Sequence, residues 1–295
     1  MSVFSENLAG GGFGAFGAYE PDLAGADAVI LPVPYDATVC YQPGTRNGPQ
    51  AIINSAPQVE HYDFDSGFNC EDLKLTLLNE IEIDVSGPEA MMARIEKVYR
   101  AVAKKVPFIL MLGGEHSITH PAVRVMAEKH KGSLSVVQFD AHADLRDSYM
   151  GSPHSHASVM RRVIDFAPIT QIGIRNVSKE EAGFIKTSGH PVYYAQDITG
   201  KTDWIDDMVK DLNENVYISV DLDGFDPSVI PGVGTPEPGG LSWRDVTEAI
   251  KRIGEKRNIV GADVVELKPL PGSVQSEFTA AKLCFKILST AFLIR

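Results

Sequence analysis

The residues best suited to chemistry lie near the middle of the chain, in residues 133–146. The first half of this segment is apolar and rich in β-branched residues, which is typical of a buried strand. Asp140, His142 and Asp144 then follow at alternate positions. In an extended chain, residues two apart point to the same side, so these three side chains would share one side. Carboxylates gathered there would repel one another and lose hydration unless a cation compensates them. The segment therefore predicts a metal site rather than a solvated acidic loop.

A second acidic pair repeats this spacing. Asp221 and Asp223 follow an apolar segment at 216–220, and His116 follows another apolar segment at 107–112. In open α/β sheets, ligands bind beyond the carboxyl ends of the strands. If these segments are strands of one sheet, two imidazoles and four carboxylates would face a single cleft.

The composition of this donor set indicates which metals it would hold. One zinc ion usually takes three or four ligands that are rich in His or Cys, so the carboxylates here are too many for it. Mixed carboxylate and imidazole ligation favours harder ions such as Mn²⁺, and carboxylates can bridge two of them. Two such ions can hold a hydroxide between them and lower its pKa towards neutrality. The predicted reaction class is hydrolysis.

Alternating strand and helix patterns surround these segments and predict an α/β fold. The expected architecture has three layers, α/β/α, with a mostly parallel central sheet. We interpret residues 1–295 as one domain, with the Gly-rich residues 1–26 as an irregular N-terminal arm. Further strands are expected at 28–33, 75–83, 169–174, 192–194 and 259–266. Helices are expected at 49–55, 87–105, 121–130, 157–163, 204–213, 244–253 and 279–292.

Charge and cysteine content argue against several classes of protein. The formal net charge of -12 argues against nucleic acid or an anionic membrane as a partner, and it suits a small cationic substrate. The 3 cysteines are isolated and odd in number, which argues against a disulfide framework and suits a reducing compartment. No basic N-terminal region precedes an apolar run, and the longest apolar run, 106–112, is too short to span a bilayer. We therefore expect a soluble, cytoplasmic protein.

Three segments resemble the signature segments of one enzyme family. They are G-G-E-H-S at 113–117, D-A-H-A-D at 140–144 and S-V-D-L-D-G-F-D-P at 219–227. In their order and spacing they are similar to those of the arginase/agmatinase (ureohydrolase) family, and the similarity covers most of the chain. The resemblance implies an arginase-like fold. Together with Phe13 and Phe16 in the arm, it also implies a homo-oligomer, either a trimer or a hexamer.

The resemblance further implies a binuclear centre with two Mn²⁺ per subunit. Each metal would have its own His–Asp pair and would share two bridging aspartates, so that the six ligands are His116 with Asp144, His142 with Asp223, and the bridging Asp140 and Asp221. The implied reaction is attack of the metal-bridging hydroxide on a guanidinium carbon, which releases urea and an amine.

Two more residues resemble catalytic groups of the family. Glu266, in A-D-V-V-E-L-K-P, resembles its guanidinium-binding glutamate, and a carboxylate can form charge-assisted bonds to such a group. The structural alternative is a pair between Glu266 and Lys268. His156, in S-H-A-S-V-M-R-R, resembles the agmatinase histidine, and an imidazole can bring a proton to the leaving amine at neutral pH. We interpret His154 as a surface residue, and Asp226 as a turn-forming or outer residue rather than a ligand.

The substrate is indicated by the segment D-L-R-D-S-Y at 144–149. It departs from the Asn- and Ser-bearing stretch by which arginases recognise an amino-acid head group. This departure favours agmatine, which has an amine tail and no carboxylate, and which would be cleaved to putrescine and urea. Arg146 leaves alternatives open, because a free arginine near the tail would prefer a carboxylate. Either Asp147 neutralises it, or the substrate is another guanidino compound, such as guanidinobutyrate, arginine or a modified agmatine.

Two hypotheses from other classes remain at this point. One is a deacetylase-like hydrolase of related topology with a single metal. The other is a non-catalytic binding protein that retains the arginase fold. Metal content per subunit and urea release separate these hypotheses from a ureohydrolase.

Overall fold

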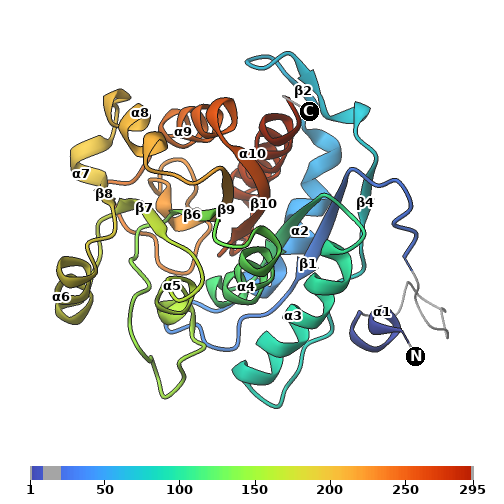
Figure 1. Cartoon of the computed structure of the whole chain (residues 1–295), viewed down its shortest axis with the longest axis horizontal. Helices are drawn as coiled ribbons and strands as arrows, with labels where there is room; N and C mark the ends of the chain where they lie inside the picture. Colours follow the sequence, from blue (N-terminus) through green and yellow to red (C-terminus); the bar gives the residue numbers. More distant parts are fainter. Residues whose placement is uncertain (1, 9–20, 294–295) are drawn as a thin grey trace.

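A parallel sheet of eight strands forms the middle layer of the protein (Figure 1). The computed structural model describes residues 2–8 and 21–293. The strand order is β4-β1-β5-β10-β9-β6-β7-β8, and each neighbouring pair is parallel. The strands are β1 (Ala28–Val33), β4 (Leu75–Leu77), β5 (Phe108–Gly113), β6 (Leu134–Phe139), β7 (Ile169–Ile174), β8 (Val192–Tyr194), β9 (Asn215–Asp221) and β10 (Asn258–Val265).

Helices cover both faces of this sheet, so the predicted three-layer α/β/α fold is confirmed (Figure 1). One face is covered by α2 (Gly48–Ser55), α8 (Asp203–Lys210), α9 (Trp243–Lys256) and α10 (Gln275–Phe292). The other face is covered by α3 (Pro88–Ala103), α4 (Thr119–His130) and α5 (Val159–Val163). Helices α6 (Lys179–Ser188) and α7 (Ala195–Ile198) flank β8 in the chain. None of the described helices is long and apolar enough to cross a membrane.

Strand β5 shows why the sheet needs both helical layers. Phe108, Leu110 and Leu112 belong to the apolar cluster on one face, whereas Ile109 and Met111 belong to the cluster on the other face. All five are buried. Alternate residues of a strand point to opposite faces, so a continuous apolar run can be buried only between two layers.

The strand predicted at 75–83 is shorter than expected, because β4 ends at Leu77. Beyond it, the backbone N–H of Leu78 still donates to Ile30 O, and that of Ile81 donates to Pro32 O. Pro32 lacks an N–H with which to return a ladder bond, so regular pairing with β1 stops there.

The N-terminal arm predicted as irregular contains a short helix, α1 (Val3–Asn7). Phe4 and Leu8 are buried, and Glu6 Oε2 pairs with Lys97 Nζ of α3 at 3.0 Å. A helix of one turn is too short to show a periodic pattern, and it is stabilised by packing rather than by its own propensity. Phe13 and Phe16, which supported the expected oligomer, lie outside the described residues.

Helix α6 lies where no helix is expected, although the sequence carries a signal for it. Ser178 and Glu181 form a capping box, and Gly189 ends the helix with a φ of 69°. A Ser followed three residues later by Glu is a helix-start pattern. Its apolar stripe is weak, and for this reason periodicity alone does not reveal it. A small hairpin of β2 (Tyr62–Asp63) and β3 (Phe68–Asn69) also lies where no strand is expected.

Gly114 lets two strand ends come close together. Its N–H donates to Val33 O at 3.0 Å, and the next N–H, of Glu115, donates to Tyr35 O at 2.7 Å. A Cβ atom added at Gly114 would lie only 1.9 Å from Tyr35 O. The second glycine of the G-G-E-H-S segment is therefore required by the close approach of backbone to backbone.

We expect Gly114→Ala to lower the free energy of unfolding by roughly 3 kcal/mol or more, because the added methyl group must displace the backbone of Tyr35. Gly183→Ala in α6 is the matched control, since no atom lies within 4 Å of its added Cβ. That change should be neutral or stabilise by about 0.5–1 kcal/mol, because alanine favours a helix over glycine. Urea unfolding followed by circular dichroism compares the two variants, and equal stabilities would contradict the packing argument.

Candidate metal centre and active-site cleft

The six candidate ligands and Glu266 follow or end four neighbouring strands in the middle of the sheet, β5, β10, β9 and β6, whereas His156 lies in the 3₁₀ helix η5 (His156–Ser158). His116 follows β5 in the 3₁₀ helix η4 (His116–Ile118), and Asp140 follows β6. Asp221 ends β9, Asp223 lies in the 3₁₀ helix η6 (Leu222–Gly224), and Glu266 follows β10. Because the strands are parallel, their carboxyl ends meet at one edge of the sheet. The structure thus brings together residues that are far apart in the chain.

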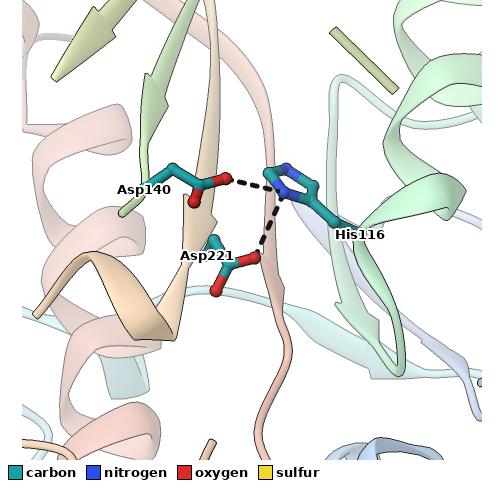
Figure 2. A group of neighbouring side chains, drawn as sticks. All are labelled: His116, Asp140 and Asp221. Atoms are coloured by element: carbon teal, nitrogen blue, oxygen red, sulfur yellow. Dashed lines mark ion pairs between the residues drawn. The ribbon is translucent and has the colours of Figure 1, made fainter. Parts of the chain in front are cut away.

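The first cluster is built around the imidazole of His116, which is 1% exposed (Figure 2). Its Nδ1 atom lies 3.0 Å from Asp140 Oδ2, 3.2 Å from Asp144 Oδ2 and 3.2 Å from Asp221 Oδ2. Among the described residues this buried nitrogen has no well-aligned hydrogen-bond partner. A ring nitrogen can donate only one hydrogen, whereas three carboxylates converge on it. A cation between them would satisfy all four groups, so this donor set fits a metal ion.

The second cluster is built around His142. Its Nδ1 atom lies 3.0 Å from Asp223 Oδ2 and 3.6 Å from Asp140 Oδ1. Asp140 therefore presents one oxygen to each cluster, and both clusters have donors spaced to hold a metal ion. Asp221 presents Oδ2 to the first cluster, while its Oδ1 accepts a hydrogen bond from the Asp223 N–H. A bridging role is thus visible in the contacts of Asp140, and for Asp221 it stays a prediction.

Asp140, His142 and Asp144 converge for a reason other than the predicted one. They do not lie on an extended strand, because β6 ends at Phe139. The backbone instead forms a turn after Phe139. The His142 N–H donates to Asp140 Oδ1 at 2.6 Å, and Asp144 has a positive φ of 54°. A non-glycine residue in this region is strained, which is common where a structure positions functional groups. The predicted alternation along an extended strand is therefore wrong, although the three side chains do converge.

Burial and neighbouring charge change the pKa values of both histidines. Burial opposes a charge on His116, but its contacts with the three aspartates that face it outweigh this and raise its pKa well above the ordinary value. For His142, burial is likewise outweighed by the charges of Asp223 and Asp140, and the pKa is raised. Without a metal, both imidazoles therefore hold a proton at neutral pH.

The pKa values of two of the aspartates are raised, so their carboxyl groups also retain protons more readily. Burial, followed by the charge of Asp140, raises the pKa of Asp144 to about 7. Burial, followed by the charges of Asp223 and Asp140, raises the pKa of Asp221 well above the ordinary value. The centre concentrates more negative charge than its surroundings solvate, and either protons or cations must balance it.

A buried chain of hydrogen bonds holds the His116 ring from behind. His116 Nε2 lies 2.8 Å from Ser219 Oγ, which donates to Asp263 Oδ1 at 2.7 Å. Asp263 Oδ2 in turn accepts from the Tyr217 hydroxyl at 2.8 Å. Such outer contacts fix the orientation of a metal-binding imidazole. This chain of residues is not predicted from the sequence, although one signal for it is present: Asp263 is an aspartate inside an otherwise apolar strand.

Glu266 and His156 both line a cleft of about 230 Å³ next to the two clusters. Glu266 Oε1 accepts a hydrogen bond from the His116 N–H at 2.7 Å. Lys268, the alternative partner of Glu266, instead donates to Gln42 Oε1 at 2.8 Å. Burial, followed by the positive charges of His142 and His116, lowers the pKa of His156 to about 4, so its imidazole is neutral at pH 7. 

His154, by contrast, does not line this cleft. It is half-buried, and its ring centroid lies 5.7 Å from that of His120. The prediction that His154 is a surface residue is therefore only partly right: the side chain is half-buried, and it lies outside the cleft.

The outer part of the cleft surrounds Arg146. The Arg146 guanidinium lies over the ring of Tyr149 at 4.9 Å, and Arg146 Nε lies 3.9 Å from Glu181 Oε2. The suggestion that Asp147 neutralises Arg146 is wrong, because Asp147 Oδ1 pairs with Arg162 at 2.6 Å. The carboxylate beside Arg146 is Glu181, which enters the site from α6 and was not expected from the sequence.

We expect the purified protein to bind two Mn²⁺ per subunit, and Asp223→Ala to bind one, because it removes a donor that faces the second cluster only. Asp226→Asn is the matched control. Asp226 accepts hydrogen bonds from the N–H groups of Ser228, Gly239 and Gly240, which makes it a turn-forming residue. Elemental analysis after dialysis, with circular dichroism to verify folding, measures the result. Two metals retained in Asp223→Ala would contradict the assignment, as would a metal lost in Asp226→Asn.

We also expect Mn²⁺ binding to release protons and to weaken as the pH falls. The metal-free protein raises the pKa values of His116 and His142, so both are protonated at neutral pH. A metal requires the neutral imidazole and must displace those protons. Calorimetric titrations in two buffers of different ionisation enthalpy measure the protons released. Affinity that is constant from mildly acidic to mildly alkaline pH would contradict this account.

Comparison with known proteins agrees with the geometry of the site. Residues 26–289 match the Arginase family. The chain is 37% identical to an N(1)-aminopropylagmatine ureohydrolase of Synechocystis sp., over 90% of this chain and 89% of that protein. It is 36% identical to an agmatinase of Pyrococcus horikoshii, over 90% of this chain and 93% of that protein.

A solved structure of an agmatine ureohydrolase of Thermoplasma volcanium superposes with a TM-score of 0.83. That structure is 35% identical in sequence and covers 92% of each chain. Fold, metal-binding clusters and sequence similarity thus lead to one conclusion. The chain belongs to the arginase family of ureohydrolases, enzymes that hydrolyse a C–N bond of linear amidines.

Proposed function

We propose that this ureohydrolase cleaves the guanidino group of agmatine to putrescine and urea, using two Mn²⁺ per subunit. A modified agmatine with an N1-aminopropyl group is the second candidate, because relatives of both names have almost the same identity to the chain. The observation that carries the proposal is the charge of the outer cleft. Glu181 and Glu237 line it, and Arg146 is its only lysine or arginine among the described lining residues.

The roles proposed for the chain's own residues follow from where they lie. The six donors would hold the metals, which when bound activate water as the nucleophile. Glu266 would accept hydrogen bonds from the guanidinium and fix the direction in which its carbon faces that water. Glu266 is 9% exposed and has a φ of 64°, so its side chain is held in place by a strained backbone at the end of β10.

His156 would transfer the proton that the leaving amine needs. It lines the same cleft as Glu266, and burial lowers its pKa, so the imidazole is neutral, and able to accept a proton, at pH 7. The proton of the attacking water would pass through His156 to the nitrogen that departs as the C–N bond breaks. An amine leaves more readily once protonated than as an anion.

Selection among guanidino compounds would depend on the tail. The negative charges of Glu181 and Glu237 beside the outer cleft would attract a cationic tail and would repel a carboxylate tail. Arg146, the one lysine or arginine among the described lining residues, favours the opposite choice, but it already lies against Tyr149 and near Glu181. Guanidinobutyrate would have to draw Arg146 away from these partners. For arginine the same argument applies to its α-carboxylate.

The two hypotheses from other classes have less support. A deacetylase-like site with one metal does not account for two donor clusters that share Asp140. A non-catalytic protein does not require the cleft to keep Glu266 and His156 beside those clusters. Assembly into a trimer or hexamer stays a prediction, which sedimentation would test.

Urea release from a panel of guanidino compounds tests the proposal. We expect kcat/KM for agmatine or its aminopropyl derivative to exceed that for arginine by roughly a hundredfold, because an unpaired carboxylate in the cleft costs several kcal/mol. Arg146→Ala should widen this ratio, because Arg146 is the only lysine or arginine among the described residues that line the cleft. Arg162→Ala, whose guanidinium pairs with Asp147, is the matched control. If guanidinobutyrate is the best substrate and Arg146→Ala abolishes that preference, Arg146 selects a carboxylate and the proposed substrate is wrong.

A further inference from the structure

Glu115 is a fully buried carboxylate that the proposed chemistry does not use. It stands between Gly114 and the candidate ligand His116, and its oxygens bind the loop that follows β1 and the hydroxyl of Ser117. Glu115 Oε2 accepts from the Thr38 N–H at 2.6 Å, and Glu115 Oε1 accepts from the Thr38 hydroxyl at 2.6 Å. Oε1 also accepts from the Ser117 hydroxyl at 2.5 Å. One side chain is thus held by both the main chain and the side chain of Thr38.

Thr38 in turn contacts His156 in two ways. The backbone N–H of His156 donates to Thr38 Oγ1 at 3.1 Å, and His156 Nδ1 lies 3.3 Å from the same oxygen. The hydroxyl has one hydrogen, and it is directed to Glu115. While Glu115 is a carboxylate and can only accept, Thr38 Oγ1 accepts at its other contacts, and this favours the tautomer of the neutral imidazole with its hydrogen on Nδ1. Nε2 is then the ring nitrogen with a lone pair.

The fold explains why these residues meet. Thr38 belongs to the loop that leaves β1, Glu115 follows β5, and these two strands are parallel neighbours. The same loop continues through residues 39–42, which line the mouth of the cleft. The buried Glu115 therefore anchors a loop that closes one side of the site, and it does so next to the proposed proton carrier.

We propose that Thr38, fixed by Glu115, is a positioning residue that sets the tautomer and orientation of His156. The inference rests on the proposed function of His156 as proton carrier. With Nδ1–H held by Thr38, Nε2 accepts a proton from the attacking water. Nε2 then gives this proton to the leaving nitrogen, which keeps the electron pair of the broken C–N bond. Nδ1 keeps its hydrogen throughout, and the imidazole is neutral before and after the cycle.

Two substitutions at Thr38 separate the hydroxyl from the shape of the side chain. Thr38→Val keeps the branched shape and removes the hydroxyl, whereas Thr38→Ser keeps the hydroxyl. We expect Thr38→Val to lower kcat by roughly tenfold to a hundredfold, because a misplaced His156 would lose part of the roughly 10²–10⁴-fold that general acid–base catalysis contributes. KM should change by only a few fold, and the pH profile of kcat should shift. Thr38→Ser should recover most of the lost turnover, and Mn²⁺ content should be equal in all three proteins.

A second measurement does not depend on turnover. Nitrogen NMR of ¹⁵N-histidine-labelled, metal-free protein at neutral pH distinguishes the tautomers, and the His156 signals are identified by their loss in His156→Asn. The wild type and Thr38→Ser should show protonated Nδ1 and bare Nε2, and Thr38→Val should lose this preference. The proposal is overturned if the tautomer is the same in Thr38→Val, or if Thr38→Ser is as impaired as Thr38→Val. A wild type that releases no urea from any guanidino compound would reject the proposed function instead, and the NMR result would still decide the positioning role.

Discussion

The structure depends on keeping four aspartates together where almost no water reaches them. Asp140, Asp144, Asp221 and Asp223 are each at most 5% exposed. Three of them share one arrangement, in which a backbone N–H binds one carboxylate oxygen and the other oxygen faces a histidine Nδ1. The N–H donors are His142 for Asp140, Asp223 for Asp221 and Ala141 for Asp223. In each of these three carboxylates, a backbone N–H thus binds one oxygen, and a proton or a metal ion balances the negative charge at the other oxygen.

This arrangement requires unusual backbone at the ends of the central strands. Asp144 and Glu266 are both non-glycine residues with positive φ, 54° and 64°. Each is held by hydrogen bonds of its own main chain. The Met160 and Arg161 N–H groups donate to Asp144 O, and the Glu266 N–H donates to Gly114 O. Strain of this kind persists only where the surroundings over-determine it. The regular sheet therefore supplies the rigidity, and the strained strand ends direct the side chains.

The sequence predicts those parts of the site that depend on local patterns. An apolar segment followed by Asp or His identifies a strand and a ligand at its end, so the central sheet and the six candidate ligands are accessible from the chain alone. The contacts of Thr38 with Glu115 and His156 cannot be predicted in this way, because they join residues that lie 77 and 118 positions apart in the chain. The same holds for Glu181, which reaches Arg146 only once α6 has packed. Such contacts depend on how the strands and helices are arranged in space, and no periodic pattern in the sequence predicts that arrangement.

Chemistry and selectivity are consequently placed on different parts of the fold. The donors that would hold metals lie at the ends of β5, β10, β9 and β6, in the most buried part of the sheet. The groups that a substrate tail would meet come from the loop at 39–42, from residues 146–149, from α6 and from the loop that carries Glu237. Loops tolerate substitution better than strand ends packed on both faces. A change of tail preference therefore requires only that peripheral side chains change charge, as Arg146 and Glu237 could, while the buried centre stays the same.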